Sequence, residues 1–517
     1  MKPFKHILFS LFIIIILIPT LFFPISSDLA VFNLAAKTIL KGSKLYVDFI
    51  DIKTPQIYLL NVLNQIVFGN SEAAFRFFDF LWQVLTSISI VFIFYKINKN
   101  YLGAYLASII YCLLYATLHY SQTYQCEGFL GLPLLWLVYL QIRTQNKTLN
   151  YFLQGFILGF IIALKITFGI IFLAILVVDI INRISTFELI RKYGLILISS
   201  IIGFIFFSFP LINKQSFDGF ITMLDYLKHY NEYSYLTLEW VRYSLLLLTK
   251  YLADTLSIFI LFLALIGVYL SLGKNFEPLT TQKYFFQVVV VIGLFLLLSV
   301  IVERKFHSYH FSRLYVLIGI ISSYGSLYFF KKIINYLYNS NILRKTLMIL
   351  LLIIGVFFTP IPRYFNLLIP TYLYLTDSNK YDDYYQRNDA TLLRKDYIDI
   401  SKKLKEISNP NDSILVISIG ANSIYYFLGA NSFSSFASSS FYLSQYLPEA
   451  WENIIKREIA TAKCIIIQTN DVHPLLTGHP YSSWTAFNCN SNLKSLLDRD
   501  FYLFESKGPF KIFRKKI

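Results

Sequence analysis

Residues 27–32 read SDLAVF, and residues 48–55 read DFIDIKTP. The first stretch follows an apolar run over residues 7–25, the kind of run that crosses roughly 30 Å of hydrocarbon as a helix. Asp28 therefore stands where a membrane helix ends, and Lys53 stands in an acidic turn before Pro55. A simple membrane anchor needs neither charge, so we expect this segment to carry the chemistry of the protein.

The composition is that of a polytopic membrane protein. The 517 residues are 56% hydrophobic and 15% charged, and the mean hydropathy of +0.56 lies outside the range of soluble domains. Because lipid cannot satisfy open backbone groups, apolar runs of about 20 residues must cross the membrane as helices. Eleven spans are predicted, at about residues 7–25, 74–95, 101–119, 128–142, 150–164, 167–182, 192–212, 246–272, 284–302, 312–330 and 346–362.

Lysine and arginine residues assign the two sides of the membrane. With a cytoplasmic N-terminus and eleven spans, most basic clusters between spans fall on one side, which agrees with the positive-inside rule. This topology depends on a break at Lys165 within the run 150–182, because an unbroken helix would invert everything downstream. The outer face then receives residues 26–73, 120–127, 213–245, 303–313 and everything from 363 onward.

Two domains are expected. Residues 1–362 form a transmembrane domain with residues 26–73 as its first outer loop, and residues 363–517 form an extracytoplasmic α/β domain. In the second domain, polar turns separate short periodic elements. We expect helices at 391–407 and 449–459, strands at 413–419 and 463–468, and a closing hairpin of 501–505 with 510–514.

Residues 28–41 are predicted to form a helix that lies in the membrane interface. Ser27 or Asp28 is a suitable N-cap, and Gly42 is a suitable end. Apolar side chains such as Phe32 fall on one helix face and lysines fall on the other. We therefore expect the apolar face to enter lipid and the lysines to meet headgroups.

Several classes of function are excluded or disfavoured. The net charge of +16 is spread between apolar runs rather than gathered in a basic arm, so we expect contacts with membrane lipids and no nucleic-acid partner. The four cysteines lack CxxC spacing and predict neither a zinc site nor a redox motif. A disulfide between Cys464 and Cys489 stays open.

The segment from Asp28 to Pro55 resembles the GT-C membrane glycosyltransferases. The similarity is to the bacterial branch related to protein O-mannosyltransferases and to the transferase that adds aminoarabinose to lipid A. That branch has an acidic residue after the first span and then the pattern G-x-x-x-Y-x-D-x-x-D-x-K-x-P. The pattern is present here as Gly42, Tyr46, Asp48, Asp51, Lys53 and Pro55. Weaker similarity covers most of the membrane region and includes residues 125–129, 155–165 and 304–310.

For Asp28, the resemblance implies a catalytic base that removes the proton of an acceptor hydroxyl as the oxygen attacks the anomeric carbon. A carboxylate suits this task because burial at a membrane face raises its pKa toward the working range. The structural alternative is a plain N-cap. Many relatives carry a second acid directly afterwards, whereas this chain has Leu29 there, so a role that needs two adjacent carboxylates does not carry over.

A polyprenyl-phosphate leaving group needs positive charge and hydrogen-bond donors. The candidates are Lys53, Lys165, Arg304, Lys305 and His310. Lys165 is the most informative because a lysine inside an apolar run needs water or an anionic partner, and the donor phosphate is the anion that the hypothesis supplies. The structural alternatives are snorkelling for Lys165, ordinary helix flanks for Arg304 and Lys305, and interfacial packing for His310.

Glu127 is the second acidic residue expected at the site. It orients the acceptor, assists Asp28, or holds a divalent cation together with His310, and its structural alternative is a solvated loop glutamate. That cation is the one cofactor considered, and the sequence does not require it. Residues Tyr46, Asp48 and Asp51 are expected to shape the loop around Lys53 or to position the acceptor.

The predicted protein is therefore an α-helical polytopic GT-C glycosyltransferase with a C-terminal α/β domain. By resemblance it transfers a hexosyl or pentosyl group, with inversion, from a polyprenyl-phosphate-linked donor to a hydroxyl of a lipid, glycan or protein outside the cell (inner) membrane. No Rossmann or P-loop sequence is present, which agrees with a lipid-linked donor. The rivals are a flippase or transporter of lipid-linked glycans and a receptor or assembly scaffold. Clustering of Asp28, Lys53, Glu127 and Lys165 would favour the enzyme.

Overall fold

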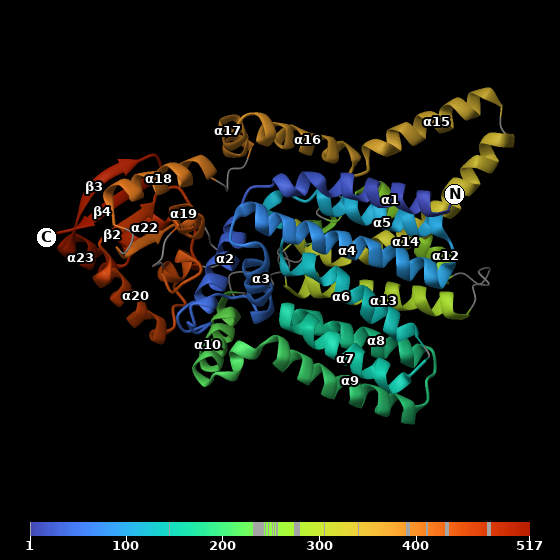
Figure 1. Cartoon of the computed structure of the whole chain (residues 1–517), viewed down its shortest axis with the longest axis horizontal. Coiled ribbons are helices and arrows are strands. Elements are labelled where there is room, and N and C mark those ends of the chain that lie inside the picture. The colour runs from blue at the N-terminus through green and yellow to red at the C-terminus, as the bar shows by residue number, and fades with distance from the viewer. Residues whose placement is uncertain are drawn as a thin grey trace. The chain divides into compact units, whose positions relative to one another are not determined.

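The computed structural model describes the chain apart from a set of short segments. These segments are residues 1, 144, 231–241, 243, 244, 247, 251, 253, 255, 256, 273–279, 304, 305, 340, 389–392, 410, 411, 430–433, 473–476 and 517. The described residues form two compact units (Figure 1). Unit 1 contains residues 1–24, 71–208 and 241–372, and unit 2 contains residues 25–70, 209–240 and 373–517.

Unit 1 is helical throughout its described part. Its helices are α1 (Lys2–Leu17), α4 (Glu72–Asn98), α5 (Tyr101–Ala116), α6 (Cys126–Ile142), α7 (Lys147–Leu164), α8 (Ile170–Ile181), α9 (Thr186–Phe207), α12 (Ile258–Leu272), α13 (Thr280–Glu303), α14 (Tyr315–Asn339), α15 (Ile342–Phe357) and most of α16 (Ile361–Thr376). Short 3-10 helices join some of them, namely η1 (Ile18–Phe22), η2 (Tyr120–Gln122), η3 (Ile166–Gly169) and η6 (Ser308–Leu314).

The predicted membrane spans are confirmed as helices. Within the described residues, five helices are long and apolar enough to cross a membrane, or up to seven if each of two bent helix pairs counts as one span. Four shorter apolar helices accompany them, at Tyr101–Ala116, Cys126–Ile142, Ile166–Ile181 and Ile258–Ser271. Each of the eleven predicted spans overlaps one of these helices or pairs.

The predicted break at Lys165 is present. Helix α7 ends at Leu164, Lys165 has an extended backbone with φ −164°, and η3 and α8 follow. The run 150–182 is therefore two helices rather than one.

Helices α7 and α9 pack with their backbones close together. A Cβ atom added to Gly159 would lie 2.5 Å from the carbonyl oxygen of Ser200, and one added to Gly155 would lie 2.3 Å from that of Ile196. Small residues allow this approach in membrane helices, where dispersion contacts replace the hydrophobic effect. The two helices thus form a tight pair (Figure 1).

A buried polar cluster around Asp179 ties four helices of unit 1 together. Asp179 lies on α8, and its carboxylate accepts hydrogen bonds from Lys192 (2.6 Å) and Tyr193 (2.7 Å) on α9. It also accepts from Gln141 on α6 (3.0 Å) and Tyr284 on α13 (2.6 Å). Every carboxylate oxygen is paired, which is the condition under which a buried charge is tolerated in a membrane domain.

Unit 2 combines helices with a four-stranded sheet. Its elements are α2 (Ser27–Leu40), α3 (Pro55–Phe68), η4 (Phe209–Ile212), α10 (Lys214–Tyr230), α17 (Ser378–Asn388), α18 (Arg394–Ile407), β1 (Ile414–Ile417), α19 (Ala421–Leu428), η7 (Ser439–Leu443), α20 (Glu449–Thr461), β2 (Cys464–Gln468), α22 (Ser483–Cys489), α23 (Ser491–Asp500), β3 (Phe501–Lys507) and β4 (Phe510–Lys515). The strand order is β1-β2-β4-β3, with β1 and β2 parallel and the other pairs antiparallel. The expected helices, strands and closing hairpin are confirmed, although strand β1 is shorter than predicted.

All three chain segments of unit 2 share one hydrophobic core. Ile50 and Tyr226 lie in the same cluster as Phe436 and Trp451. The backbone of Ile50 also pairs with the C-terminal segment, since its N–H donates to the carbonyl of Ser435 (2.6 Å) and its carbonyl accepts from the N–H of residue 437 (2.8 Å). The first loop and α10 are therefore integral parts of the α/β unit.

Helix α2 departs from its predicted place. Nine of its 14 residues are buried, including Asn33 and Thr38, and it packs against α3 and α19. The expectation that its apolar face enters lipid is wrong, because helical elements of unit 2 cover it. Gly42 follows the helix with φ +81°, as expected for a residue that ends a helix.

The four cysteines are free thiols, so Cys464 and Cys489 form no disulfide.

Candidate active site

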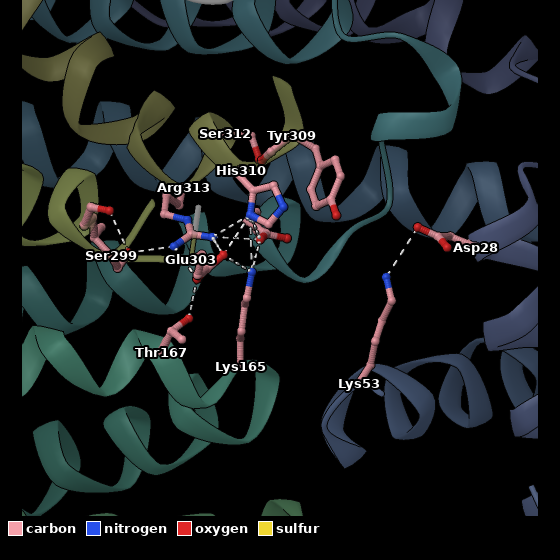
Figure 2. Close-up of polar contacts among 12 residues, drawn as sticks. Asp28, Lys53, Lys165, Thr167, Ser299, Glu303, Tyr309, His310, Ser312 and Arg313 are labelled. Atoms are coloured by element: carbon pink, nitrogen blue, oxygen red, sulfur yellow. Dashed lines mark hydrogen bonds and ion pairs between the residues drawn. The ribbon is translucent and has the colours of Figure 1, made fainter. Parts of the chain in front are cut away.

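Asp28 lies in the first turn of α2 and does not cap the helix. The N-cap is Ser26, whose Oγ accepts a hydrogen bond from the N–H of Leu29 at 3.2 Å. The N-cap interpretations of Ser27 and Asp28 are therefore wrong. The Asp28 side chain is 43% exposed, and Lys53 Nζ lies 3.3 Å from its Oδ2 (Figure 2). A negative charge in the first turn also interacts favourably with the helix dipole.

The loop before α3 presents Lys53 to Asp28. Tyr46 adopts a left-handed backbone with φ +66°, and its hydroxyl donates to the carbonyl of Lys53 at 2.7 Å. Asp48 closes the turn by accepting from the N–H of Lys44 at 2.7 Å. Lys53 Nζ also lies 4.9 Å from the centre of the Phe32 ring, where a cation is attracted to the π system.

Asp51 is buried and accepts a hydrogen bond from the hydroxyl of Tyr58 at 2.5 Å. Burial raises its pKa above the ordinary value, and the nearby Lys53 charge opposes that rise. The contact with Tyr58 joins the loop to α3. Tyr46, Asp48 and Asp51 therefore all stabilise the loop conformation around Lys53.

In unit 1, Lys165 stands at the centre of an ionic cluster. Its Nζ lies 2.7 Å from Glu127 Oε1 and 2.7 Å from Glu303 Oε2. The carboxylates are almost fully buried, with side chains 2% and 8% exposed. The break after α7 turns Lys165 toward this cluster, and Figure 2 shows it pointing to Glu303 and His310. The anionic partner that the sequence requires for Lys165 is therefore provided by two protein carboxylates.

Arg313 completes the cluster from η6. Its Nη2 lies 2.9 Å from Glu127 Oε1, and its Nη1 lies 2.9 Å from Glu303 Oε1. The guanidinium also donates to Ser299 Oγ at 2.6 Å, while Thr167 donates to Glu303 at 2.5 Å (Figure 2). Lysine also bridges the two carboxylates here, but only the planar guanidinium offers separate N–H groups in a fixed fork, which reach Glu127, Glu303 and Ser299 at once.

His310 shares the same buried space. Its Nδ1 lies 2.9 Å from Glu303 Oε2 and 3.1 Å from Arg313 Nη2, so a donor tautomer and an acceptor tautomer both find a partner. Its Nε2 is buried and has no hydrogen-bond partner among the described residues. An orphaned buried ring nitrogen is the kind of group that a bound ligand or ion satisfies.

Sequence reasoning missed Glu303 and Arg313. It chose Arg304 and Lys305 from the same stretch, and these two residues lie outside the described part of the chain. Arg313 could have been chosen from the sequence, because placing an arginine at the start of an apolar run costs free energy, as it does for Lys165. Glu303 offered no such signal, since a glutamate that ends a span beside two basic residues has the appearance of an ordinary flank.

The structure therefore brings the predicted residues together as two groups. Asp28 and Lys53 form an ion pair in unit 2, and Glu127, Lys165 and His310 gather in unit 1. With neutral His310, the two carboxylates and two cations of the unit 1 cluster carry no net formal charge.

The ligand atoms of Glu127, Glu303 and His310 lie within 4.8 Å of one another, which is close enough to hold one metal ion. Two carboxylate oxygens and one imidazole nitrogen are a suitable donor set for a divalent cation. The same atoms are, however, the ones that contact Lys165 and Arg313. A dication added alone would place four positive charges against two negative ones, so it fits this site only together with an anion.

Comparison with known proteins gives a family match over part of the chain. Residues 53–212 match the family described as Dolichyl-phosphate-mannose-protein mannosyltransferase, and this range includes Glu127 and Lys165. A comparison with curated protein sequences gives no match.

The whole chain is similar in fold to ArnT from Cupriavidus metallidurans. The crystal structure of ArnT bound to undecaprenyl phosphate superposes with a TM-score of 0.61 at 10% sequence identity, over 98% of this chain and 97% of that chain. The apo structure gives a TM-score of 0.59 at 9% identity, over 99% of this chain and 98% of that chain. The partial family match and the nearly complete fold match agree with the resemblance that the sequence predicted: residues 53–212 are similar to this mannosyltransferase family, and the whole chain has an ArnT-like fold.

Proposed function

We propose that the chain transfers a sugar, with inversion, from a polyprenyl-phosphate-linked donor to an acceptor hydroxyl of a lipid, glycan or protein. The observation that carries this proposal is the place of Asp28. Its carboxylate is partly exposed, sits in the first turn of α2 and pairs with Lys53, while Ser26 performs the capping. A carboxylate that is partly exposed and leaves the capping of α2 to Ser26 is accessible to an incoming substrate.

Asp28 acts as the general base in this proposal. As the acceptor oxygen attacks the anomeric carbon, a C–O bond forms, the bond between that carbon and the phosphate oxygen breaks, and the acceptor proton passes to the Asp28 carboxylate. The polyprenyl phosphate leaves as an anion and needs no proton. Lys53 lies 3.3 Å from Asp28 and orients its carboxylate.

The unit 1 cluster serves the donor phosphate in this proposal. Lys165 and Arg313 supply positive charge and several N–H donors, which suit a phosphate leaving group. Since Glu127 and Glu303 already balance both cations, a phosphate must either displace one carboxylate from them or arrive with a compensating positive charge. A proton on His310 or a divalent cation held by Glu127, Glu303 and His310 would provide that charge.

Similarity in fold to a protein crystallised with undecaprenyl phosphate supports the donor class. The family match supports transfer from a lipid-phosphate-linked sugar. From the distribution of lysine and arginine between the spans, we propose that the reaction takes place on the extracytoplasmic face of the cell (inner) membrane and that the domain of residues 363–517 is also extracytoplasmic.

The test is mass analysis of envelope glycans in cells that carry the wild-type gene, no gene, or Asp28→Asn. Loss of a general base usually lowers turnover by roughly two to four orders of magnitude, so Asp28→Asn should leave the product at the level of the deletion. Asp225→Asn is the matched control because Asp225 lies on α10 of the same unit with its side chain 62% exposed. Wild-type product from Asp28→Asn, at equal protein level, would show that Asp28 is not the base.

A further inference from the structure

The N-terminus of α2 contacts the turn between β1 and α19. Ser27 donates its hydroxyl hydrogen to the carbonyl oxygen of Ile419 at 3.2 Å, and both residues belong to unit 2. This turn lies at the carboxyl end of β1, beside the carboxyl end of the parallel strand β2. In open α/β sheets this edge is where functional groups gather.

The turn itself is rigidly held. Gly420 N–H donates to Ser418 Oγ at 3.0 Å, and Ser418 N–H donates to Ser439 Oγ at 2.8 Å. A Cβ atom at Gly420 would lie 2.1 Å from the ring of Tyr397, so the backbone is pressed against helix α18. The peptide that receives Ser27 therefore has little freedom to move.

Asp471, shortly after β2, binds the backbone N–H of Ile419, the residue whose carbonyl oxygen accepts from Ser27. Its Oδ2 accepts from the N–H of Ile419 at 2.9 Å and from Ser483 Oγ at 2.7 Å, and its Oδ1 accepts from the N–H of Ser483 at 3.0 Å. Asp471 is 7% exposed, and burial raises its pKa while the hydrogen bonds from Ser483 and Ile419 oppose that rise. An asparagine there would leave one of the two backbone N–H groups facing an amide N–H, whichever way the amide turned.

These contacts form one continuous path from helix α22 to the base. It runs from Ser483 through Asp471 and Ile419 to Ser27, and Asp28 is the next residue in the chain. We propose that Asp471 is a positioning residue for Asp28, through which the C-terminal α/β domain sets the orientation of the first turn of α2. This inference rests on the proposed role of Asp28 and adds to it a task for the domain.

This path gives a reason why α2, a helix of the first loop, belongs to the same unit as the C-terminal α/β domain. A reacting carboxylate must be held within a fraction of an ångström, because small misplacements of a catalytic group cost large factors in rate. The first turn of α2 follows a non-helical segment and has its own restraints in the Ser26 N-cap and the Asp28–Lys53 ion pair. The Ser27–Ile419 contact supplies a restraint from a segment distant in sequence.

The experiment measures the position of Asp28 without using the unidentified substrate. A water-soluble carbodiimide joins a carboxylate to an amine that contacts it, and mass spectrometry of digested full-length protein quantifies the amide between Asp28 and Lys53. The Asp412–Lys463 pair, at 2.7 Å, provides an internal reference. It precedes β1 and β2, at the opposite end of the same two strands, so it reports whether the domain remains folded.

We expect Ser27→Ala and Asp471→Asn each to lower the yield of the Asp28–Lys53 amide at least threefold relative to the reference amide. Ser27→Thr keeps a hydroxyl and should restore the wild-type ratio. The double variant should be no worse than the more severe single variant, because both residues act on one path. A wild-type ratio in both single variants, or additive effects in the double variant, would overturn the inference.

Envelope glycan product measured on the same variants separates this inference from the proposed function. If Asp28→Asn makes no product while Ser27→Ala and Asp471→Asn keep both the wild-type amide ratio and full product, the positioning inference alone is wrong. If Asp28→Asn makes full product, the proposed function is wrong, whatever the amide ratio. Should Asp471→Asn fail to fold, the reference amide will fall as well, and Ser27→Ala with Ser27→Thr decides the matter.

Discussion

Replacing Lys165 with methionine is expected to destabilise the protein. The change removes the cation that lies 2.7 Å from both Glu127 and Glu303, so the cluster passes from no net formal charge to −1. From the sequence alone, Lys165→Met would relieve an uncompensated charge and leave stability unchanged or improved. The structure reverses this expectation, because the charge left uncompensated is that of a buried carboxylate.

The magnitude follows from the burial of the partners. Removing one member of a buried ion pair costs about 3–5 kcal/mol. Because the Lys165 side chain is 24% exposed and Arg313 still contacts both carboxylates, we expect a loss near the lower end, about 3 kcal/mol. Adding Glu127→Gln to Lys165→Met restores the charge balance and should recover about 1–3 kcal/mol.

The assay is reversible unfolding of the purified protein in mixed micelles with increasing SDS, followed by circular dichroism. Lys332→Met on an exposed face of α14 is the matched control and should change the free energy of unfolding by less than about 0.5 kcal/mol. Binding of undecaprenyl phosphate, measured separately, should weaken in Lys165→Met. Stability equal to the wild type, or a double variant less stable than Lys165→Met alone, would refute the ionic cluster as the reason.

Three further predictions concern packing, pH and topology. Gly159→Ala should lower the free energy of unfolding by about 1–3 kcal/mol in the same assay, because its Cβ would meet the backbone of α9. Gly194→Ala meets nothing within 4 Å and should stabilise the helix by up to about 1 kcal/mol. Equal effects of the two substitutions would contradict the close packing of α7 and α9. Burial raises the pKa of Asp51 above 3.8, so the unfolded chain loses its proton first, and the stability that this group contributes at low pH is lost as pH rises through the folded pKa. The stability of Asp51→Asn relative to the wild type should therefore increase as pH rises above about 4, and a difference independent of pH would count against the burial effect. In a background without native cysteines, a cysteine at position 146 should be protected from an impermeant thiol reagent and one at position 378 should react; the opposite pattern would invert the assigned topology.

Much of the fold could be predicted because hydropathy reports local structure directly. The break at Lys165 and the helices and strands of the α/β domain follow from local patterns of apolar, polar and turn residues. The place of α2 did not follow, because its amphipathic pattern is the same whether its apolar face meets lipid or protein. Only the tertiary structure shows that α3 and α19 cover it.

The candidate site was predictable in part for the same reason. Lys165 and Glu127 could be chosen because each is unusual in its own sequence context. Their partners Glu303 and Arg313 are distant in sequence, and the contacts among them depend on how α6, α7 and α13 pack. The role of the C-terminal domain could not be predicted either, since the contact of Ser27 with Ile419 joins residues 392 positions apart.

The two buried polar clusters of unit 1 have a consequence for membrane thickness. Helix α6 carries Glu127 near its start and Gln141 near its end, and α13 likewise carries Tyr284 and Glu303, so the clusters fasten both ends of the same helices. From Glu127 to Gln141 helix α6 rises about 21 Å, and from Tyr284 to Glu303 helix α13 rises about 28 Å, both shorter than the roughly 30 Å of a typical hydrocarbon core. Helices fastened at both ends cannot slide to match a thicker bilayer, so the lipid must thin around them or expose apolar surface. The protein is therefore expected to be most stable in bilayers of short-chain lipids and to lose stability as the acyl chains lengthen.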